Sequence, residues 1–545
     1  MEDHWDMIPL LERDAAGTLG FADLWAQQNE HRYVVPWLFM IGLARITRWN
    51  IATELWLNIA FSLATLGVLA ALIVRTCRGP ARALAPWLGL VASLMTFSQV
   101  KWENWLWGMS QPAFASALLA CASIALLAWL GPTISGVALA MLAAIAGVLS
   151  FANDFVLFAL VPLGLVSDPR APLRRRGLLA LGAVCVGAAV TLLYLQGLVH
   201  PAKHPDPWLF VKRPFAFVGY VLAYLGAPLG WPETGWSIAW GAVGALALTA
   251  ATVWLFSRAP VRRVDVLPWL LLALWVSGSG ALAGIGRLGM GVAQAVSSRY
   301  TTISTFFWVS VAVVVGLTVL DVFERRGPSD RRTLAVLTAA VLAVVGASAS
   351  YATVWARTDA WVASADESHW IARECVRFHR EAPDPCLAIV HHNPALVRQR
   401  AQVLERLRLG PLAVPPSRPP LAAYERLEDA PPPGSVDGAW VRVAVVRFLV
   451  GGFSEYRATE LSLTGWAKDP ATGRAPQALL FVVDGVVLEE VPLPSATEAG
   501  DRPRWDYRIN TFRLPRGGQT LEAYAVLEGR RIARLGVAPV GNLGS

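Results

Sequence analysis

The chain has 545 residues, of which 55% are hydrophobic and only 16% are charged, and it contains 24 Trp. This composition is too apolar and too aromatic for an ordinary soluble protein, so we expect a polytopic membrane protein. The formal net charge of +8 at pH 7 is what Lys and Arg in cytoplasmic loops produce. No basic stretch interleaved with aromatic residues points to nucleic acid.

The chain begins with an acidic cluster, EDHWD, which contains Glu2, Asp3 and Asp6. Residues 23–37, DLWAQQNEHRYVVPW, are polar and aromatic and carry groups that can hold a sugar or a phosphate. The opening MEDHWDMIPLLERD has no basic segment followed by an apolar run, so we expect no signal peptide. A polar head is hard to translocate without an upstream helix. We therefore expect either that a helix precedes Met1 in the natural chain or that the protein is naturally N-out, and the sequence leaves both open.

Hydrophobic runs long enough to cross a bilayer follow from residue 51 onward. The first, 51–74, is followed by Arg75, Arg78 and Arg82, which places that loop in the cytoplasm and residues 1–50 outside. Further spans are predicted at 83–99, 112–130, 133–149, 151–167, 177–199, 236–257, 264–286, 299–320 and 333–354, about ten in total. The run at 214–230 would reverse the sidedness of the next basic loop if it spanned. We interpret it as a re-entrant or interfacial helix on the outer face.

The loops that this topology places outside are polar, whereas the cytoplasmic loops are short and basic. The outer segments are 1–50, 99–111, a turn at residues 153–154, 200–235 and 287–299. We therefore expect the function on the non-cytoplasmic side, carried by an acidic loop and juxtamembrane helices over 1–50 and by a transmembrane domain over 51–354.

The composition becomes that of a soluble protein after about residue 355. Residues 355–433 are predicted to be an extracytoplasmic segment, helical over 359–410 and then a Pro-rich linker. Residues 434–545 alternate apolar and polar positions between Gly and Pro, which predicts a β-sandwich.

Five cysteines divide between these two parts of the chain. Cys375 and Cys386 lie in the polar C-terminal part and are expected to form a disulfide if that part is outside the cytoplasm. Cys77, Cys121 and Cys185 lie in or beside apolar spans, where Cys acts as a small hydrophobic residue. No spacing of Cys and His resembles a zinc site.

The carboxylates of the N-terminal cluster are candidates for general base chemistry. An inverting glycosyl transfer needs one carboxylate to accept the proton of the attacking hydroxyl, and in some enzymes another to hold a divalent cation. Glu2, Asp3 and Asp6 supply enough carboxylates for both roles. A solvated acidic N-terminus explains the same residues equally well, and the sequence leaves the two interpretations level.

Basic residues of the outer loops are candidates for binding a donor phosphate, whose developing charge Arg or Lys stabilises. Arg287 and Arg299 bracket one outer loop, with Tyr300 adjacent, while Lys212 and Arg213 lie in another and Lys101 in a third. The alternative for each is snorkelling to the lipid interface. Arg299 is the strongest candidate, because the span that it precedes begins with the polar turns YTTIST.

Candidates for substrate binding lie in three further places. Glu103 and Asn104 lie among Trp residues that include Trp105, which either anchor the protein at the membrane interface or stack on sugar rings. His31 and Arg32 either hold a juxtamembrane helix or contact substrate. Asp154, near the outer membrane face, is costly unless paired or hydrated, which makes it a functional candidate.

The order of these parts resembles the GT-C superfamily of integral membrane glycosyltransferases, which use polyprenyl-phosphate-linked sugars. The segments EDHWD, DLWAQQNEHR followed by Pro36, KWENWLWG and SSRYTTIS are similar to motifs of a largely uncharacterised bacterial family within it. The resemblance covers roughly residues 1–400. It implies a bacterial inner-membrane protein with its C-terminal domain outside the cytoplasm, a polyprenyl-phosphate-linked sugar donor and a glycan or lipid-linked acceptor.

The resemblance also implies roles for particular residues. It implies a catalytic carboxylate in the first outer loop, best matched by Asp3 with Glu2 as its neighbour, and lipid-phosphate contacts from Arg299 and Arg287. Members of the superfamily have a helix before the acidic loop, which this sequence lacks. They differ in their need for a cation, so a Mg²⁺ or Mn²⁺ ion is left open. The acidic head, the Trp-rich loop and the Arg-flanked loop are expected to meet in one pocket.

Two other functions compete with this interpretation. A transporter or lipid-carrier flippase would need ionisable residues at the bilayer midplane and paired half-repeats, and the sequence has few of the former and none of the latter. A catalytically silent glycan-binding membrane protein is the other alternative. The segment GWAKDPATGRAPQALLFVVDG resembles β-rich modules of bacterial surface-glycan proteins. A spacer or lid that packs on the membrane domain explains this segment as well.

Overall fold

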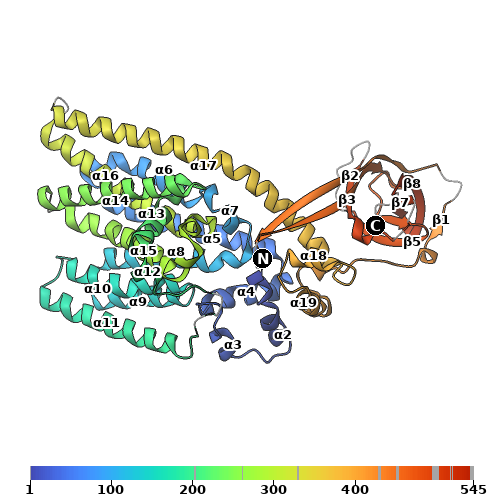
Figure 1. Ribbon diagram of the computed structural model, residues 1–545, viewed down its shortest axis with the longest axis horizontal. Helices are drawn as coiled ribbons and strands as arrows, with labels where there is room; N and C mark the ends of the chain where they lie inside the picture. The colour runs from blue at the N-terminus through green and yellow to red at the C-terminus, as the bar shows by residue number, and fades with distance from the viewer. Residues whose placement is uncertain are drawn as a thin grey trace. The chain divides into compact units, whose positions relative to one another are not determined.

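The protein is described by a computed structural model that covers residues 2–199, 201, 204–259, 262–327, 330–427, 431–449, 453–493, 503–515, 517 and 520–540. The side chains of residues 2, 3, 447–449, 453 and 454 lie outside this description. The chain is mostly helical and ends in a β-rich region (Figure 1). It divides into two compact units, which are described in turn.

The helical unit consists of residues 19–43 and 51–362. Its longer helices run side by side (Figure 1). The helices are α3 (Phe21–Trp25), α4 (Val34–Thr47), α5 (Ile51–Thr76), α6 (Ala85–Thr96), α7 (Trp102–Trp105), α8 (Gln111–Leu130), α9 (Ile134–Val148), α10 (Leu157–Ser167), α11 (Leu173–Leu195), α12 (Leu209–Lys212), α13 (Pro214–Gly230), α14 (Thr234–Arg258), α15 (Arg263–Arg287), α16 (Thr301–Arg326) and α17 (Arg331–Arg377). The ends of α4 and α17 continue into the second unit.

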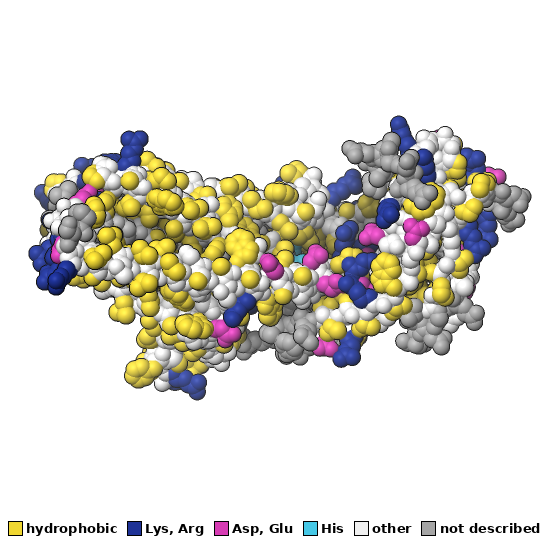
Figure 2. Space-filling model, turned by 90° about the horizontal axis from the view of Figure 1, so that it is seen from above, with side chains coloured by type: hydrophobic (Ala, Val, Ile, Leu, Met, Phe, Trp, Pro, Cys, Tyr) yellow, Lys and Arg dark blue, Asp and Glu magenta, His cyan; other side chains and the backbone are white. Residues whose placement is uncertain are grey.

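Among the described residues, eight helices are long and apolar enough to cross a membrane. They coincide with eight of the predicted spans. The predicted spans 133–149 and 151–167 correspond to two shorter apolar helices, Ile134–Val148 and Ala152–Ser167. Hydrophobic side chains cover much of the face of this unit that Figure 2 shows, as a lipid-facing surface requires. The structure thus has the helices of a membrane protein.

Aromatic side chains fill the core of the helical unit. Trp269, Trp275 and Phe306 are each at most 2% exposed. Helices α13 and α14 pack closely because Gly226 and Gly241 face the partner backbone, where a Cβ atom would lie within 2 Å of a carbonyl oxygen. Small residues at such contacts let two helices approach without a steric penalty.

Helix α13 is the run that the sequence suggested as re-entrant or interfacial. Its contacts move from helix to helix along its length. Phe217 lies against Gly284 of α15, the Leu225 carbonyl accepts from Trp308 of α16 (2.8 Å), and the Leu229 carbonyl accepts from Ser350 of α17 (2.5 Å). The second half of α13 is buried. Its placement against a lipid surface stays a prediction.

The second unit consists of residues 1–18, 44–50 and 363–545. Its helices are α1 (Glu2–Trp5), α2 (Ile8–Ala15), α18 (Asp384–Ala388) and α19 (Pro394–Leu407), together with the end of α17. Arg400 of α19 pairs with Asp6 (2.8 Å), and Arg45 pairs with Asp14. Cys375 and Cys386 are joined by a disulfide, with 5.7 Å between their Cα atoms.

Two β-sheets complete the second unit. A five-stranded sheet has the order β1-β8-β7-β4-β5 and a three-stranded sheet has the order β2-β3-β6. The strands are β1 (Glu425–Arg426), β2 (Gly434–Leu449), β3 (Phe453–Ala467), β4 (Ala478–Val483), β5 (Val486–Pro492), β6 (Arg504–Asn510), β7 (Thr520–Leu527) and β8 (Arg531–Pro539). Both sheets contribute side chains to one apolar core, among them Leu463, Phe481 and Ala523.

The segments that precede these sheets differ in two ways from the sequence-based expectation. The helical pattern over 359–410 is broken into the end of α17, α18 and α19. The Pro-rich segment expected as a linker contains strand β1, which pairs in parallel with β8. This segment is therefore tied to the five-stranded sheet by backbone hydrogen bonds.

Candidate functional site

Polar residues of two distant segments meet in the helical unit. The segment formed by the 3₁₀ helix Gln99–Lys101 and α7 packs against the 3₁₀ helix Ser298–Tyr300 and the start of α16. Asn104 joins the two, because its Nδ2 donates to the Arg299 carbonyl (2.8 Å) and to Thr302 Oγ1 (2.6 Å), and its Oδ1 accepts from Ser110 (3.0 Å). Asn104 is thus held by three hydrogen bonds, which favours a positioning role.

Lys101 is a buried lysine in this arrangement, with 1% of its surface exposed. Its Nζ donates to the Thr96 carbonyl (2.9 Å) and approaches Thr305 Oγ1 at 3.5 Å. The rings of Trp105 and Phe306 each lie 5.7 Å from Nζ. Within the described part of the chain no carboxylate forms an ion pair with Lys101. A buried charge without an opposite partner is costly and is therefore a sign of function.

Arg299 is the exposed cation of the same segment. Its guanidinium Nε lies 3.9 Å from Glu103 Oε2, and its side chain is 49% exposed. Glu103 Oε2 also accepts a hydrogen bond from Ser298 Oγ (2.7 Å). Arg299 is therefore only loosely paired and has donors to offer a ligand. We refer to Lys101, Glu103, Asn104, Ser298 and Arg299 as the polar cluster.

A second group of polar side chains surrounds Glu30. Arg287 donates to Glu30 Oε1 (2.5 Å) and to His204 Nε2 (2.7 Å). Because Arg287 has only donors, His204 Nε2 is an acceptor, so the ring proton is on Nδ1, which lies 3.5 Å from Glu30 Oε2. Burial raises the pKa of Glu30, but His31, Arg287 and His204 outweigh it, and the pKa is below its usual value.

His31 is the fourth member of this group, with Nε2 3.9 Å from Glu30 Oε1. Its ring is stacked between Tyr33 and Phe151, and its Nδ1 accepts from the Ala152 amide (3.2 Å). Burial lowers the pKa of His31 to about 4. His31 is therefore neutral at pH 7. We refer to Glu30, His31, His204 and Arg287 as the Glu30 cluster.

Asp154 lies in the 3₁₀ helix Ala152–Val156 and is fully buried. Its Oδ1 accepts from Ser116 (2.9 Å) and Trp275 (2.8 Å), both neutral donors. The Oδ2 atom lies against Gly147, where a Cβ would come within 2.3 Å. It has no hydrogen-bond partner among the described residues. The sequence predicted that Asp154 needs a partner, and the structure gives it hydrogen bonds but no cation.

Other candidates have structural partners. The Arg32 guanidinium donates to three backbone carbonyls, of Trp25, Tyr194 and Gln196, so it holds the end of α11. Trp105 donates to the Ser98 carbonyl (3.0 Å), and Tyr300 lies 5.9 Å from the ring of Tyr224. In the predicted outer segment 200–235, Lys212 pairs with Asp206 (2.7 Å). The side chains of Lys212 and Arg213 are both exposed.

The N-terminal carboxylates belong to the second unit. The side chains of Glu2 and Asp3 lie outside the described residues. Asp6 is described, and it pairs with Arg400. The expected meeting of this head with Arg299 in one pocket stays a prediction.

Several residues of the site were not singled out from the sequence. Glu30 and His204 complete the environment of Arg287, and Ser116 and Trp275 complete that of Asp154. Glu30 was part of a quoted motif, so its charge in a polar juxtamembrane segment was an available signal. Trp275 gave none, because a Trp in an apolar span is ordinarily core.

The described residues also bear on a metal ion. Among them, no three His, Cys, Asp or Glu side chains come together in a way that could hold one. The polar cluster pairs cations with a single carboxylate, a donor set suited to an anion and not to Mg²⁺ or Mn²⁺.

Comparisons with known proteins give no relative for this chain. A scan against protein-family models finds no match, and searches of curated proteins and of solved structures find none either. The fold and the site therefore define the class only: a helical protein with membrane-spanning candidates, a cationic cluster at the start of α16 and a C-terminal β-rich region.

Proposed function

We propose that the protein is a GT-C-like membrane glycosyltransferase that moves a sugar from a polyprenyl-phosphate-linked donor to an extracytoplasmic cell-envelope glycan. One observation carries the proposal: buried Lys101, without a carboxylate partner in the described structure, belongs to the same cluster as half-exposed Arg299 at the start of α16. The Arg299 cation, a buried lysine that a bound anion would keep protonated, and a helix N-terminus favour an anion. The helical unit has an apolar surface suited to lipid, so an anion that is part of a lipid, such as a lipid phosphate, could reach this cluster from the bilayer.

The chemistry of the proposed transfer is an inverting displacement. The acceptor hydroxyl attacks the anomeric carbon, and the bond between that carbon and the donor phosphate oxygen breaks. A carboxylate takes the hydroxyl proton, and the electron pair leaves with the polyprenyl phosphate, whose charge Arg299 and Lys101 oppose. In this proposal Asp3 is the base with Glu2 beside it, as the resemblance implies, while Asp6 already pairs with Arg400.

The finer architecture belongs to the same proposal. It comprises about ten membrane spans, a C-terminal β-sandwich and a bacterial inner-membrane location with the C-terminal domain outside the cytoplasm. The disulfide between Cys375 and Cys386 supports the last point, because disulfides persist in oxidising compartments.

The test uses the full chain in nanodiscs, supplied with a panel of radiolabelled polyprenyl-phosphate sugars and a cell-envelope glycan acceptor. Transfer of label to the acceptor is expected for at least one donor. Arg299→Ala is expected to lower transfer by about a hundredfold, in line with the loss of one group that stabilises the leaving charge. Asp3→Asn is expected to abolish it.

Arg357→Ala is the matched control for Arg299→Ala. Arg357 is 48% exposed and lies 3.9 Å from Glu233, whereas Arg299 is 49% exposed and lies 3.9 Å from Glu103. The control should transfer at the wild-type rate. If the chain reconstituted in liposomes moves the donor from one leaflet to the other and forms no product, the flippase is favoured. Equal activity of the two Arg variants would refute the proposed phosphate site.

A further inference from the structure

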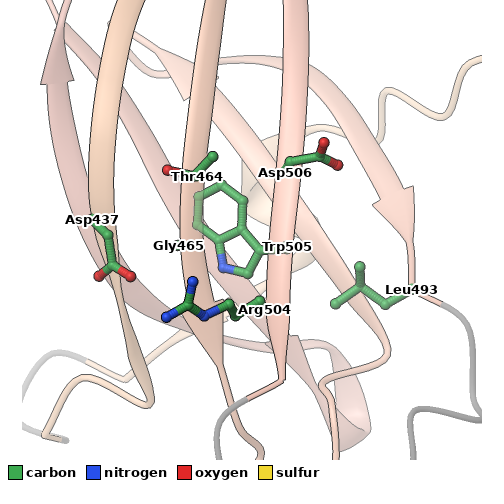
Figure 3. A pocket seen from close by; sticks show the side chains of 7 residues that line it. All are labelled: Asp437, Thr464, Gly465, Leu493, Arg504, Trp505 and Asp506. Atoms are coloured by element: carbon green, nitrogen blue, oxygen red, sulfur yellow. The ribbon is translucent and has the colours of Figure 1, made fainter.

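A pocket in the β-rich region lies outside the polar cluster and the Glu30 cluster. It has a volume of about 550 Å³ and is lined by Asp437, Thr464, Gly465, Leu493, Arg504, Trp505 and Asp506. Figure 3 shows Trp505 at the centre of these side chains, with Asp437 on one side and Asp506 on the other. A volume of this size suits a small ligand.

The strand register brings these residues to one level of the three-stranded sheet. Thr464 of β3 pairs with Asp506 of β6, and Gly465 pairs with Trp505. Asp437 is the extra residue of a β-bulge in β2, because the register shifts between Val436 and Gly438. Bulges redirect a side chain and are enriched beside binding sites.

Trp505 gives the pocket a polar atom that is buried and unused. The residue is 6% exposed, and its indole Nε1 has no hydrogen-bond partner among the described residues. Its ring packs on Phe481, with 6.1 Å between centroids, and against Gly465, where a Cβ would come within 2.5 Å of it. Trp505 is therefore packed into the wall of the pocket with an N–H donor that the protein leaves unsatisfied.

The chemistry of the lining selects the ligand. Two carboxylates accept hydrogen bonds, Arg504 and the Trp505 N–H donate, and the Thr464 hydroxyl does both. With two anions against one cation, the lining does not favour an anionic ligand. Vicinal sugar hydroxyls, each both a donor and an acceptor, match such a mixed set.

We propose that this pocket binds a neutral saccharide of one or two sugar units. The proposal is independent of the transferase activity, since a chain that transfers nothing can still hold a glycan through its β-rich region. It also gives a physical basis to the glycan-binding alternative raised by the sequence.

The test is saturation-transfer NMR on the full chain in nanodiscs prepared without sugar-based detergents. The probes are glucose, galactose, mannose, N-acetylglucosamine, maltose and cellobiose. At least one is expected to bind with a Kd in the millimolar range. Trp505→Phe, which keeps a smaller aromatic ring and removes the N–H, should weaken binding about fivefold. Asp506→Asn should weaken it about twentyfold.

Two matched variants serve as controls. Trp440→Phe alters a half-exposed Trp of β2 that does not line the pocket, and Asp484→Asn alters an exposed carboxylate in the β4–β5 turn. Both should bind like the wild type. The proposal is overturned if no probe binds the wild type, or if Trp505→Phe and Asp506→Asn bind as tightly as their controls. A failed transfer assay would leave this result unaffected.

Discussion

Arg513 and Lys101 are both cations withdrawn from solvent, and their surroundings differ. Arg513, in the β-rich region, donates to Glu489 (2.6 Å) and to Glu374 (3.1 Å), and its guanidinium lies 3.7 Å from the ring of Phe378. Arg377 pairs with the same two carboxylates (2.6 and 3.1 Å). Lys101, in the helical unit, has neutral acceptors and two aromatic rings.

The difference separates structural charge from functional charge. The side chains around Arg513 form an ion network in which each charge meets an opposite one, so the network is complete without a ligand. Its members are Glu374, Arg377, Glu489, Tyr507 and Arg513. The cations of the polar cluster are left partly unmatched by the protein. A binding partner that brings negative charge is what would complete them. The following predictions set the two regions against each other.

The largest effect is expected in the ion network. Arg513→Met leaves Glu489 and Glu374 buried with Arg377 as their remaining cation. Breaking a buried ion pair on one side costs about 3–5 kcal/mol of folding free energy. Thermal and denaturant unfolding of the purified full chain measures this. Arg534→Met, which removes an exposed pair with Glu522 (3.0 Å), should cost less than about 1 kcal/mol; an equally small loss in Arg513→Met would mean that the network is not structural.

The pH dependence of the network is the next largest effect. Burial raises the pKa of Glu489, but Arg513 and Arg377 outweigh it, so the folded pKa is below the usual 4.5. The stabilisation is therefore complete above pH 4.5 and is lost as the pH falls below it, since the unfolded chain binds the proton first. Glu489→Gln should lose about 2–3 kcal/mol at pH 7.

Unfolding curves recorded at decreasing pH test this sign. The gap between wild type and Glu489→Gln should be constant above pH 5 and should narrow as the pH falls to 3. A gap that widens on acidification would contradict the assigned direction of the Glu489 shift.

A smaller effect is expected at Asp154. Trp275→Phe removes one of its two donors and leaves a small cavity, because a phenyl ring is smaller than an indole. The lost hydrogen bond and the cavity together are expected to cost about 2 kcal/mol of folding free energy, measured in detergent by intrinsic fluorescence. Trp236→Phe, an exposed Trp of the same unit, is the control, and equal stability of the two variants would show that neither the Trp275 hydrogen bond nor its packing carries weight.

The sequence predicts the helices well where the bilayer dictates them. A span must be apolar over some 20 residues, so hydropathy alone located the eight long helices. Helix was also predicted over 359–410, but not that it continues the last span without a break from Arg331 to Arg377, because the composition becomes polar after about residue 355. Its last turns are anchored by tertiary contacts, for example of Glu367 with Arg508 (2.6 Å), which no local pattern reveals.

The sequence predicted which residues belong to the candidate site better than it predicted which of their side chains contact one another. Outer-loop position picked out Lys101, Asn104 and Arg299, and the fold brings their segments together. The pairing of Arg287 with Glu30 joins residues 257 positions apart. Local pattern gives no access to such a contact. Sequence reasoning therefore assigned Arg287 to a phosphate, whereas the structure gives its donors to Glu30 and His204.

The smallest effect on stability is expected for Lys101→Met. Met fills a similar volume, keeps the contacts with Trp105 and Phe306, and removes the cost of burying an unpaired charge. It gives up the hydrogen bonds to Thr96 and Thr305, so the two changes should cancel to within about 1 kcal/mol. Binding of undecaprenyl phosphate in nanodiscs should nevertheless fall by at least about tenfold, because a charge-assisted contact is lost. A loss of stability as large as that of Arg513→Met, with phosphate binding intact, would place Lys101 with the structural charges. A stable variant that no longer binds the phosphate is the result that only a functional cation can give.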